Sequence, residues 1–429
     1  MAACDRPPPT EVDPEPECLP VGAVVGPLAD AGAAVWADPV RLSDPPQGGQ
    51  NPVFYDVQIR NGAMHIAFGT GSPDGADIFH AVHVREGWAQ STNISRSPHP
   101  ALGAILQLDA HGTPFVLWYE QRAQHLIRDR LISTTLLFAS GGASGWSAGE
   151  VLWHAPDPPE TQQFAITPML QPPLRGAVLV DARGEVHVAF AMVQPPEARP
   201  QLAHTRRSTA GSWSEPGNIG LGFSPKLTVD AEGRLFLASI GGEELRDVVD
   251  ITHRNPVSLR YSEDGGCTWS PIEWISIEEN AAHYPQVIAA ADGSLHLLWQ
   301  QDITGNIFPD EVWHVRSDDG GETWSDPVSI APSLPGHLYP AEPVPDATGG
   351  LHLVVGQRDH PINFTFRRPH YIYYDGSTWS EPEHLFGIEL GVGLIRADHA
   401  TGELHLMLRE TERDADGEWQ TTFLHARPR

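Results

Sequence analysis

Seven copies of one short phrase run along this 429-residue chain and constrain its fold more than any other feature. In each copy a strand, which in most copies opens at a proline, leads to an Asp/Asn and Gly turn. An alternating strand that often contains histidine then follows. Such a turn between two strands of period two is typical of a β-hairpin. The turn glycines of the seven copies are Gly62, Gly112, Gly184, Gly233, Gly293, Gly350 and Gly402.

A second phrase alternates with the first, and a tryptophan, often followed by a proline, marks it. The last three steps between these tryptophans are each about 55 residues, which fits four short strands and their turns. A sheet of that size cannot bury both faces alone, so the units must stack around an axis. We therefore predict an all-β fold, a seven-bladed β-propeller of four-stranded blades. The seven tryptophans are Trp36, Trp88, Trp146, Trp213, Trp269, Trp324 and Trp379.

The two ends of the chain predict how the ring closes. The last copy has its hairpin and a third strand near Thr421 to Leu424, and no tryptophan phrase follows. The phrase at Trp36 has no hairpin before it. We expect the N-terminal strand to complete the last blade, because closure removes exposed sheet edges.

Composition divides the chain into a tether and one domain. Residues 1–20 are proline-rich and acidic, which predicts a disordered tether, and residues 21–429 form the single propeller domain. Cys4 follows two alanines, as at the end of a bacterial lipoprotein signal, so it is a candidate lipid anchor. Its other candidate role is a disulfide with Cys18, which leaves Cys267 without an obvious partner. Either role favours an extracytoplasmic protein, secreted or lipid-anchored.

The formal net charge of −28 argues against a nucleic-acid or anionic-membrane partner, because phosphates would be repelled. The chain has no stretch of 18 uninterrupted apolar residues, so no transmembrane helix is expected. We expect a monomer.

Two turns carry the pattern Ser-x-Asp-x-Gly-x-Thr-Trp, at 262–269 and 317–324, and Asp375 begins a shortened version. From about Val21 onward the chain resembles the sialidase-like propellers, whose repeats carry this Asp-box. The resemblance implies that the turns are structural and join the third and fourth strands, opposite the active site. Asp264 and Asp319 are therefore expected to stabilise turns.

The chain departs from the sialidases of that family, which have six blades and an arginine triad. One triad arginine comes from an Arg-Ile-Pro phrase, whereas the matching place here reads Gln50-Asn51-Pro52. True sialidase activity is thus not expected. Seven-bladed relatives include glycan lyases and glycosidases that use His or Tyr in the central cleft, so the resemblance implies carbohydrate chemistry.

Candidate site residues lie on the face opposite the Asp-boxes, which we call the upper face. Residues just before the strand-opening prolines should surround the mouth of the central channel, and long loops from the second to the third strands add further groups. His and Tyr suit general acid–base work, and Arg suits capture of a carboxylate. Candidate catalytic residues are His99, His283, Tyr284, Tyr339, Glu120 and Asp302. Candidate substrate-binding residues are Asn51, Arg122, Arg254, Arg358, His360 and Arg409.

Five hairpin histidines share one repeat position, which indicates a scaffold role such as a hydrogen bond to a neighbouring turn. Other histidine pairs have no spacing specific for a metal site, so no metal or other cofactor is predicted, and a structural calcium ion is not indicated. The five histidines are His65, His187, His296, His352 and His405.

These observations predict a propeller that acts on or binds acidic oligo- or polysaccharides at its central upper-face cleft, as a glycosidase or lyase. The alternative is a non-catalytic propeller that binds glycan or protein. The strong differences among the upper loops favour one central site over a multivalent lectin.

Overall fold

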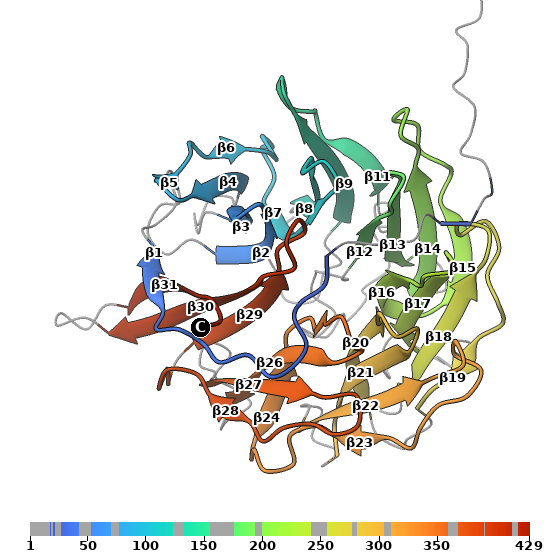
Figure 1. The fold of residues 1–429 in the computed structure, drawn as a ribbon. Helices are drawn as coiled ribbons and strands as arrows, with labels where there is room; N and C mark the ends of the chain where they lie inside the picture. Colours follow the sequence, from blue (N-terminus) through green and yellow to red (C-terminus); the bar gives the residue numbers. More distant parts are fainter. Residues whose placement is uncertain are drawn as a thin grey trace, which may run out of the picture.

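The computed structural model describes residues 18, 20–21, 27–42, 53–69, 77–122, 133–154, 176–193, 200–241, 255–276, 281–303, 310–358, 368–389, 391–413 and 419–429. Within them the chain forms β-strands and no helix, arranged in seven sheets around a central axis (Figure 1). The predicted seven-bladed β-propeller is confirmed. None of the described segments forms a helix that could span a bilayer.

Each blade is an antiparallel sheet whose first strand lies next to the axis. Blade 1 contains β2 (Val53–Arg60), β3 (Ala63–Gly69), β4 (Ile78–Val84), β5 (Gly87–Trp88) and the short β6 (Thr92–Asn93). Blade 2 contains β7 (Ala101–Leu108), β8 (Pro114–Arg122), β9 (Ser133–Gly142), β10 (Gly145–Trp146) and β11 (Glu150–His154). Blade 3 contains β12 (Ala177–Val180), β13 (Val186–Val193), β14 (Pro200–Arg207) and β15 (Gly217–Leu221).

The remaining blades follow the same order. Blade 4 contains β16 (Phe223–Val229), β17 (Leu235–Ile240), β18 (Val257–Ser262) and β19 (Glu273–Trp274). Blade 5 contains β20 (Ala282–Ala289), β21 (Leu295–Gln301), β22 (Glu311–Ser317) and β23 (Val328–Ser329). Blade 6 contains β24 (His337–Pro340), β25 (Val344–Pro345), β26 (Leu351–Arg358), β27 (Arg368–Tyr374) and β28 (Glu383–His384). Blade 7 contains β29 (Gly391–Ala397), β30 (Leu404–Arg413), β31 (Trp419–Ala426) and β1 (Val40–Leu42).

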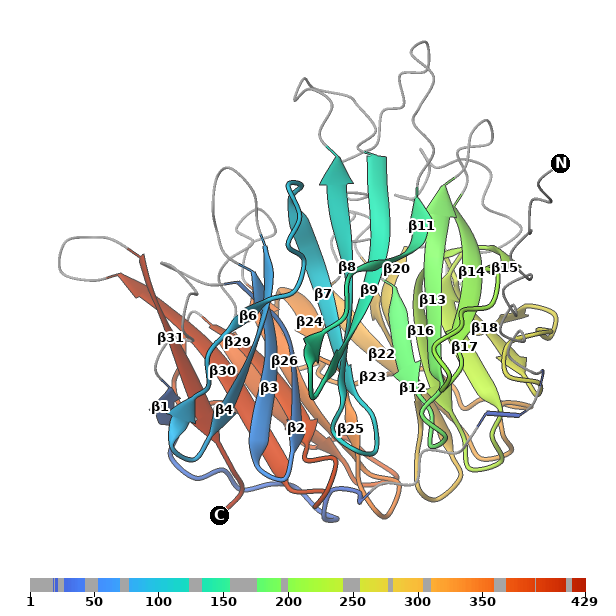
Figure 2. The ribbon, with the colours of Figure 1, turned by 90° about the horizontal axis from the view of Figure 1, so that it is seen from above.

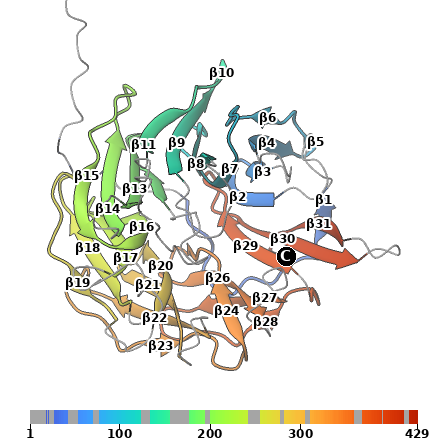
Figure 3. The same cartoon turned by 180° about the vertical axis from the view of Figure 1, so that it is seen from behind.

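The ring closes as the sequence predicts. Strand β1 pairs antiparallel with β31, so that Val40 lies opposite His425 and Leu42 opposite Phe423. In Figure 3 the blue β1 lies beside the red β31 at the outer edge of blade 7. The first and last parts of the chain therefore share one sheet.

The hairpin turns and the strand alternation explain why each repeat folds this way. Asn61 and Gly62 both have positive φ, 52° and 72°, as the turn between β2 and β3 requires. Alternate strand residues then face the neighbouring blade and form apolar layers between blades. One such layer joins Leu117 and Phe138 of blade 2 to Val188 and Phe190 of blade 3.

The two faces of the ring carry different connections (Figure 2). The hairpins between first and second strands, together with the turns between third and fourth strands, lie on one face, the lower face. In the Ser-x-Asp turn of blade 4, Ser262 Oγ accepts a hydrogen bond from Gly266 N at 2.7 Å, and Asp264 Oδ1 accepts one from Thr268 N at 2.8 Å. Both Ser-x-Asp turns lie between the third and fourth strands of their blades.

The hairpin histidines pair across strands, and the predicted bond to a neighbouring turn is not their shared feature. Each places Nδ1 against a ring nitrogen or hydroxyl on the third strand of the same blade, because the repeat position and the register recur together. The pairs are His65–His80 at 3.2 Å, His187–His204 at 3.2 Å, His296–His314 at 2.9 Å, His352–Tyr371 at 2.7 Å and His405–His425 at 2.9 Å.

Tryptophans of the second phrase pack against these pairs from the next blade. Trp379 of blade 6 lies edge-on to His314 of blade 5 and donates a hydrogen bond of 3.1 Å to its Nδ1. The rings of His204 and Trp269 make the same edge contact, with centroids 5.6 Å apart. The tryptophans thus join neighbouring blades, as their repeat position predicts.

The expected cysteine pairing is wrong. Cys18 forms a disulfide with Cys267, 249 residues away, in the Ser-x-Asp turn of blade 4. Cys4 lies outside the described residues, as does most of the predicted tether. The error has a physical cause, because the chain between the two cysteines folds into blades that return Cys267 to the N-terminal segment.

The N-terminal residues 18, 20–21 and 27–36, which we call the N-terminal strap, contact the lower face. Val21 N donates to Gly233 O of blade 4 at 3.1 Å, and Ala347 N of blade 6 donates to Ala29 O at 3.0 Å. The Tyr371 hydroxyl accepts a hydrogen bond from Ala34 N at 2.9 Å. The strap therefore joins blades 4 and 6 before the chain enters blade 7.

Candidate functional site

A cavity of about 360 Å³ lies on the axis of the ring. First-strand residues of all seven blades line it, together with a few second-strand residues such as Tyr119 and Gly356. Its size is within the range of small-molecule sites, and its lining mixes apolar groups with a few charged and phenolic ones.

Four charged side chains form one network across this cavity. Lys226 Nζ lies 3.2 Å from Glu342 Oε1, and Arg396 Nη2 lies 3.4 Å from Glu342 Oε2. The same Arg396 nitrogen lies 2.9 Å from Asp56 Oδ1. Because these residues belong to blades 4, 6, 7 and 1, the network ties together blades that are distant in sequence.

Backbone groups hold two members of the network in place. Arg396 Nε donates to Val57 O at 3.0 Å, and Asp56 Oδ2 accepts a hydrogen bond from Leu106 N at 3.0 Å. Asp56 thereby links blade 1 to blade 2 as well. This part of the network has a clear structural role.

The two carboxyl groups of the network differ in acidity. Burial raises the pKa of Asp56, against the lowering effect of Arg396. Lys226 holds the pKa of Glu342 at about 2, and Arg396 adds to this effect. Asp56 and Glu342 both contact Arg396 Nη2, yet the pKa of Asp56 is raised and that of Glu342 is lowered.

Tyr339 and Arg358 form the second polar feature of the cavity. Tyr339 lines the cavity from β24, and Arg358 ends β26, whose backbone pairs with β24. Arg358 Nη1 donates to the Tyr339 hydroxyl at 3.2 Å, and the guanidinium carbon lies 4.7 Å from the ring centroid. Both residues were candidate site residues in the sequence analysis, and in the structure they contact each other beside the cavity.

Tyr119 also lines the cavity, whereas the predicted Glu120 does not. Neighbouring strand residues face opposite sides, so Glu120 turns away, is buried, and accepts a hydrogen bond of 3.4 Å from Trp118 Nε1. Burial raises the pKa of Tyr119, which is only 2% exposed.

Left-handed backbone recurs where the first strands enter the ring, and it is strained at the two positions that are not glycine. Ser224 and Tyr284 have φ values of 52° and 48°, and Gly103 has 67°. Each lies in a bulge between its first and second strands. Left-handed non-glycine residues often mark functional sites because the fold must compensate their strain. Gly103, and not the predicted His99, therefore holds the corresponding place in blade 2.

Three predicted catalytic residues of blade 5 lie near one another but do not line the axial cavity. The His283 and Tyr284 ring centroids are 6.2 Å apart. Burial lowers the pKa of His283 to about 4, although Asp302 acts in the opposite direction. Asp302 is only 1% exposed, so it supports the His283 environment from within the protein.

The remaining predicted residues are scattered. His99 is half-buried before β7, and Arg409 is half-buried in β30 of blade 7, where burial lowers its pKa. Neither lines the axial cavity. Asn51, Arg254 and His360 lie outside the described residues, and so does the side chain of Arg122.

The charged network of the axial cavity was not predicted, because its residues lie along the first strands and site residues were expected mainly in loops. Lys226 follows Pro225, Gln286 follows Pro285, and Glu342 follows Pro340 by two positions. A charged or polar residue one or two positions after the strand-opening proline could therefore have indicated these three cavity residues. In blades 1 and 7, however, Asp56 and Arg396 have no such proline directly before them.

A second cavity of about 560 Å³ lies away from the axis, between the outer strands of blades 5 and 6. Trp379, Tyr374 and Arg316 contribute to its wall. Arg316 pairs there with Asp318 at 2.7 Å and with Asp292 at 3.0 Å. Both ion pairs lie within blade 5, and Arg316 Nη1 reaches blade 6 by donating to Gly376 O at 2.8 Å.

Comparison with solved structures shows the same class of fold. A protein of unknown function from Dyadobacter fermentans is 13% identical, with 92% of this chain and 99% of that chain covered and a TM-score of 0.52. An ulvan lyase from a new polysaccharide lyase family, bound to -[GlcA(1-4)Rha3S]-, is 12% identical, with 92% and 94% covered and a TM-score of 0.54. The polysaccharide lyase Uly1 is 10% identical, with 95% and 97% covered and a TM-score of 0.51.

No family profile matches the chain, and no curated protein matches it by sequence. At identities this low the structural matches establish the fold alone. The chain is a β-propeller.

Proposed function

We propose that this protein is a glycan-active propeller that cleaves an acidic polysaccharide in its axial cavity by β-elimination. The Tyr339–Arg358 pair carries the proposal, because it places a phenolic oxygen at the cavity wall with a guanidinium donor on it. The fold similarity to two polysaccharide lyases supports the same class. One of those lyases is bound to a unit that contains GlcA, a uronic acid.

Elimination from a uronate needs three things that these side chains can provide. A cation must neutralise the carboxylate, a base must take the proton at C5, and an acid must protonate the leaving oxygen at C4. The C4–O bond breaks as the C4–C5 double bond forms. Tyr339 would exchange the protons, because a phenol can act as acid and, when deprotonated, as base.

Lys226 is the cationic group that can meet the substrate carboxylate. Arg358 is only 2% exposed and does not line the cavity, and it holds the Tyr339 hydroxyl through Nη1. Lys226 lines the cavity, and its side chain is 28% exposed. An ammonium group has three donors, so Lys226 can bind Glu342 and a substrate carboxylate at the same time.

Hydrolysis is the second candidate, because one observation favours it. Asp56 and Glu342 both line the cavity, and their pKa values shift in opposite directions, as for an acid and a base in a glycosidase. The backbone and Arg396 contacts of Asp56 favour a structural role instead, so we place elimination first.

The disulfide supports an extracytoplasmic location. Such bonds form and persist in oxidising compartments, and Cys18–Cys267 joins segments far apart in the chain. We therefore propose a secreted or lipid-anchored protein, with Cys4 as the candidate anchor.

Assays on polysaccharides that contain uronate, with sialosides as a comparison, test the proposal. Elimination would give an unsaturated product that absorbs in the ultraviolet, and Tyr339→Phe should lower the rate at least a hundredfold. Reducing ends without ultraviolet absorbance would instead indicate hydrolysis. Binding without any turnover would overturn the enzyme proposal and favour a non-catalytic, glycan-binding propeller.

A further inference from the structure

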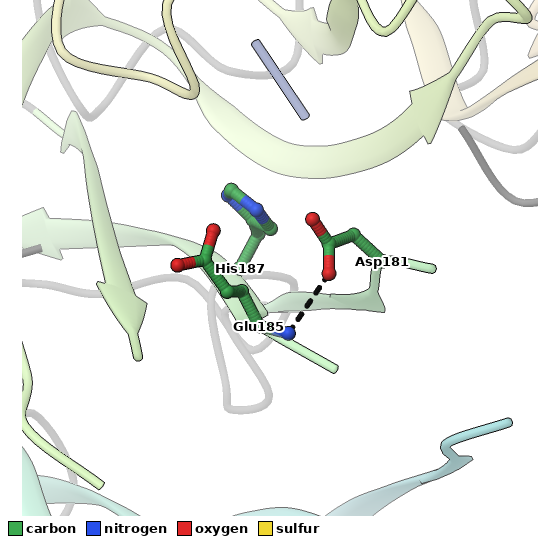
Figure 4. Close-up of side chains that lie close together, drawn as sticks. All are labelled: Asp181, Glu185 and His187. Atoms are coloured by element: carbon green, nitrogen blue, oxygen red, sulfur yellow. Dashed lines mark hydrogen bonds between the residues drawn. The ribbon is translucent and has the colours of Figure 1, made fainter. Parts of the chain in front are cut away.

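The turn between β12 and β13 in blade 3 brings two carboxylates and an imidazole together. Asp181, Glu185 and His187 each offer one ligand atom, and these atoms lie within 4.8 Å of one another. Figure 4 shows the two carboxyl groups on either side of the His187 ring. The side chains of Asp181 and His187 are fully buried, and that of Glu185 is 18% exposed.

His187 provides an independent reason to look for a ligand here. Its Nδ1 faces His204 Nε2 at 3.2 Å, but its buried Nε2 makes no hydrogen bond to any residue that the structure describes. A buried ring nitrogen without a partner costs free energy. In blade 5 the equivalent Nε2 of His296 does have a partner, Ser294 Oγ at 2.9 Å. The equivalent Nε2 atoms of His352 and His405 also lack one. Among the described residues, blade 3 alone places two carboxylates close to such a nitrogen.

The contact with His204 leaves His187 Nε2 as the ring nitrogen that can bind a metal. His187 Nδ1 lies 3.2 Å from His204 Nε2, so that nitrogen is already engaged within the protein. When Nδ1 carries the proton and donates it to His204, Nε2 presents its lone pair to the cluster.

A lone pair that faces two carboxylates is unfavourable unless a cation lies between them. Metal-bound histidines commonly donate their other ring N–H to an acceptor, and His187 Nδ1 lies within hydrogen-bond distance of such a partner, His204 Nε2. We propose that Asp181, Glu185 and His187 bind a first-row divalent metal ion, with Zn²⁺ as the natural test ion. Mixed imidazole and carboxylate ligands favour such an ion over calcium.

In this structure Arg183 forms ion pairs with both carboxylates of the cluster, Asp181 and Glu185. Its Nε lies 3.1 Å from Asp181 Oδ2, and its Nη2 lies 3.1 Å from Glu185 Oε2. The Arg183 side chain is 38% exposed, so it can move outward toward solvent. Ligand atoms around tetrahedral zinc lie about 3.4 Å apart, so a modest closure of the Glu185 side chain would complete the site.

The metal would stabilise the seam between blades 3 and 4. His187 Nδ1 contacts His204, and the His204 ring packs edge-on against Trp269, in the turn of blade 4 that holds Cys267. The proposed ion therefore has a structural role, and the inference is independent of the proposed catalytic activity.

Titration of the metal-stripped full chain with Zn²⁺, followed by calorimetry, tests the proposal. We expect one site per chain that His187→Gln abolishes and that Glu185→Gln, which keeps the side-chain shape, weakens at least about tenfold. Arg183→Gln should tighten binding about threefold or more, because it removes the competing cation. A purely structural arginine would give no such gain.

The matched control is His296→Gln in blade 5, where Ser294 already bonds the ring nitrogen. It should leave Zn²⁺ affinity unchanged. Near-ultraviolet circular dichroism checks that each variant folds, and Glu185→Gln provides the test if His187→Gln does not. Failure of the wild-type chain to bind micromolar Zn²⁺, or binding that survives both His187→Gln and Glu185→Gln, would overturn the proposal.

Discussion

Arg358 stacks on Tyr339, with its guanidinium carbon 4.7 Å from the ring centroid, and donates a 3.2 Å hydrogen bond to the same residue's hydroxyl. The two residues come from hydrogen-bonded neighbouring strands, β24 and β26. This backbone pairing fixes the cation against the phenol before any substrate arrives. Such preorganisation is what a proton-transfer group in a polysaccharide site requires.

If Tyr339 exchanges protons with substrate, Arg358→Met should lower kcat by about a hundredfold or more and change KM less. Arg409→Met is the matched control, because Arg409 is a partly buried arginine in blade 7 that does not line the axial cavity. Its kcat should stay close to that of the wild type. Steady-state kinetics on an acidic polysaccharide measure both values, and equal losses in the two variants would contradict the assigned role.

The axial network predicts unequal effects of two substitutions on stability. Arg396 contacts Asp56, Glu342 and Val57 O, whereas Lys226 contacts Glu342. Arg396→Met should cost about 3–5 kcal/mol, because it leaves Asp56 buried without its cation. Lys226→Met should cost less, since Arg396 still contacts Glu342. Urea unfolding measures both changes, and the reverse order would show that the network does not depend on Arg396.

The histidine pairs predict acid sensitivity. Burial lowers the pKa of His80, His314 and His405 to about 3 and that of His65 and His425 to about 4. Because these folded-state values lie below the unfolded value near 6.5, unfolded chains bind protons first as the pH falls. Stability should thus be complete above about pH 6.5 and decrease toward pH 4. Each fully linked histidine contributes about 1.4 kcal/mol per pH unit.

One variant separates this effect from general acid denaturation. In blade 6 a tyrosine takes the third-strand place, in the pair His352–Tyr371. His425→Tyr imitates that pair and should flatten the dependence of unfolding free energy on pH between 7 and 5. An unchanged slope would mean that His425 does not contribute to it.

The disulfide should stabilise the folded chain. Cys18→Ser, Cys267→Ser and the double variant should each lose about 2–5 kcal/mol, because the bond closes a long loop of the unfolded chain. Chemical unfolding with and without reductant measures the loss. Reductant should destabilise the wild type alone, and losses in the two single variants that add together would contradict a shared bond.

The repeat made the architecture predictable, because seven hairpins and seven tryptophan phrases leave few ways to bury their faces. The pairing of β1 with β31 followed from an incomplete first repeat and an incomplete last one. The Cys18–Cys267 bond could not be predicted in this way, because its two cysteines are 249 residues apart and come together only when the blades between them have folded.

The candidate site was predictable where it depends on neighbouring strands. Tyr339 lies just before Pro340 in β24, and Arg358 ends the antiparallel β26, so the positions of the two residues in the repeat predict that both lie toward the upper face. The contact between Lys226 and Glu342 joins blades 4 and 6 across the axis. No short sequence pattern predicts a contact between residues so far apart in the chain. His99 was misplaced because the strand of blade 2 bulges at Gly103, four positions later.

The N-terminal strap also bears on how this ring closes. Strand β1 precedes the other described strands in the chain, and its partner β31 follows them. Cys267, by contrast, precedes the final blade in the chain, so after export into an oxidising compartment the bond to Cys18 can form before β31 arrives. The nascent chain would then carry β1 already fastened to the growing ring, at a high effective concentration for β31 when it emerges.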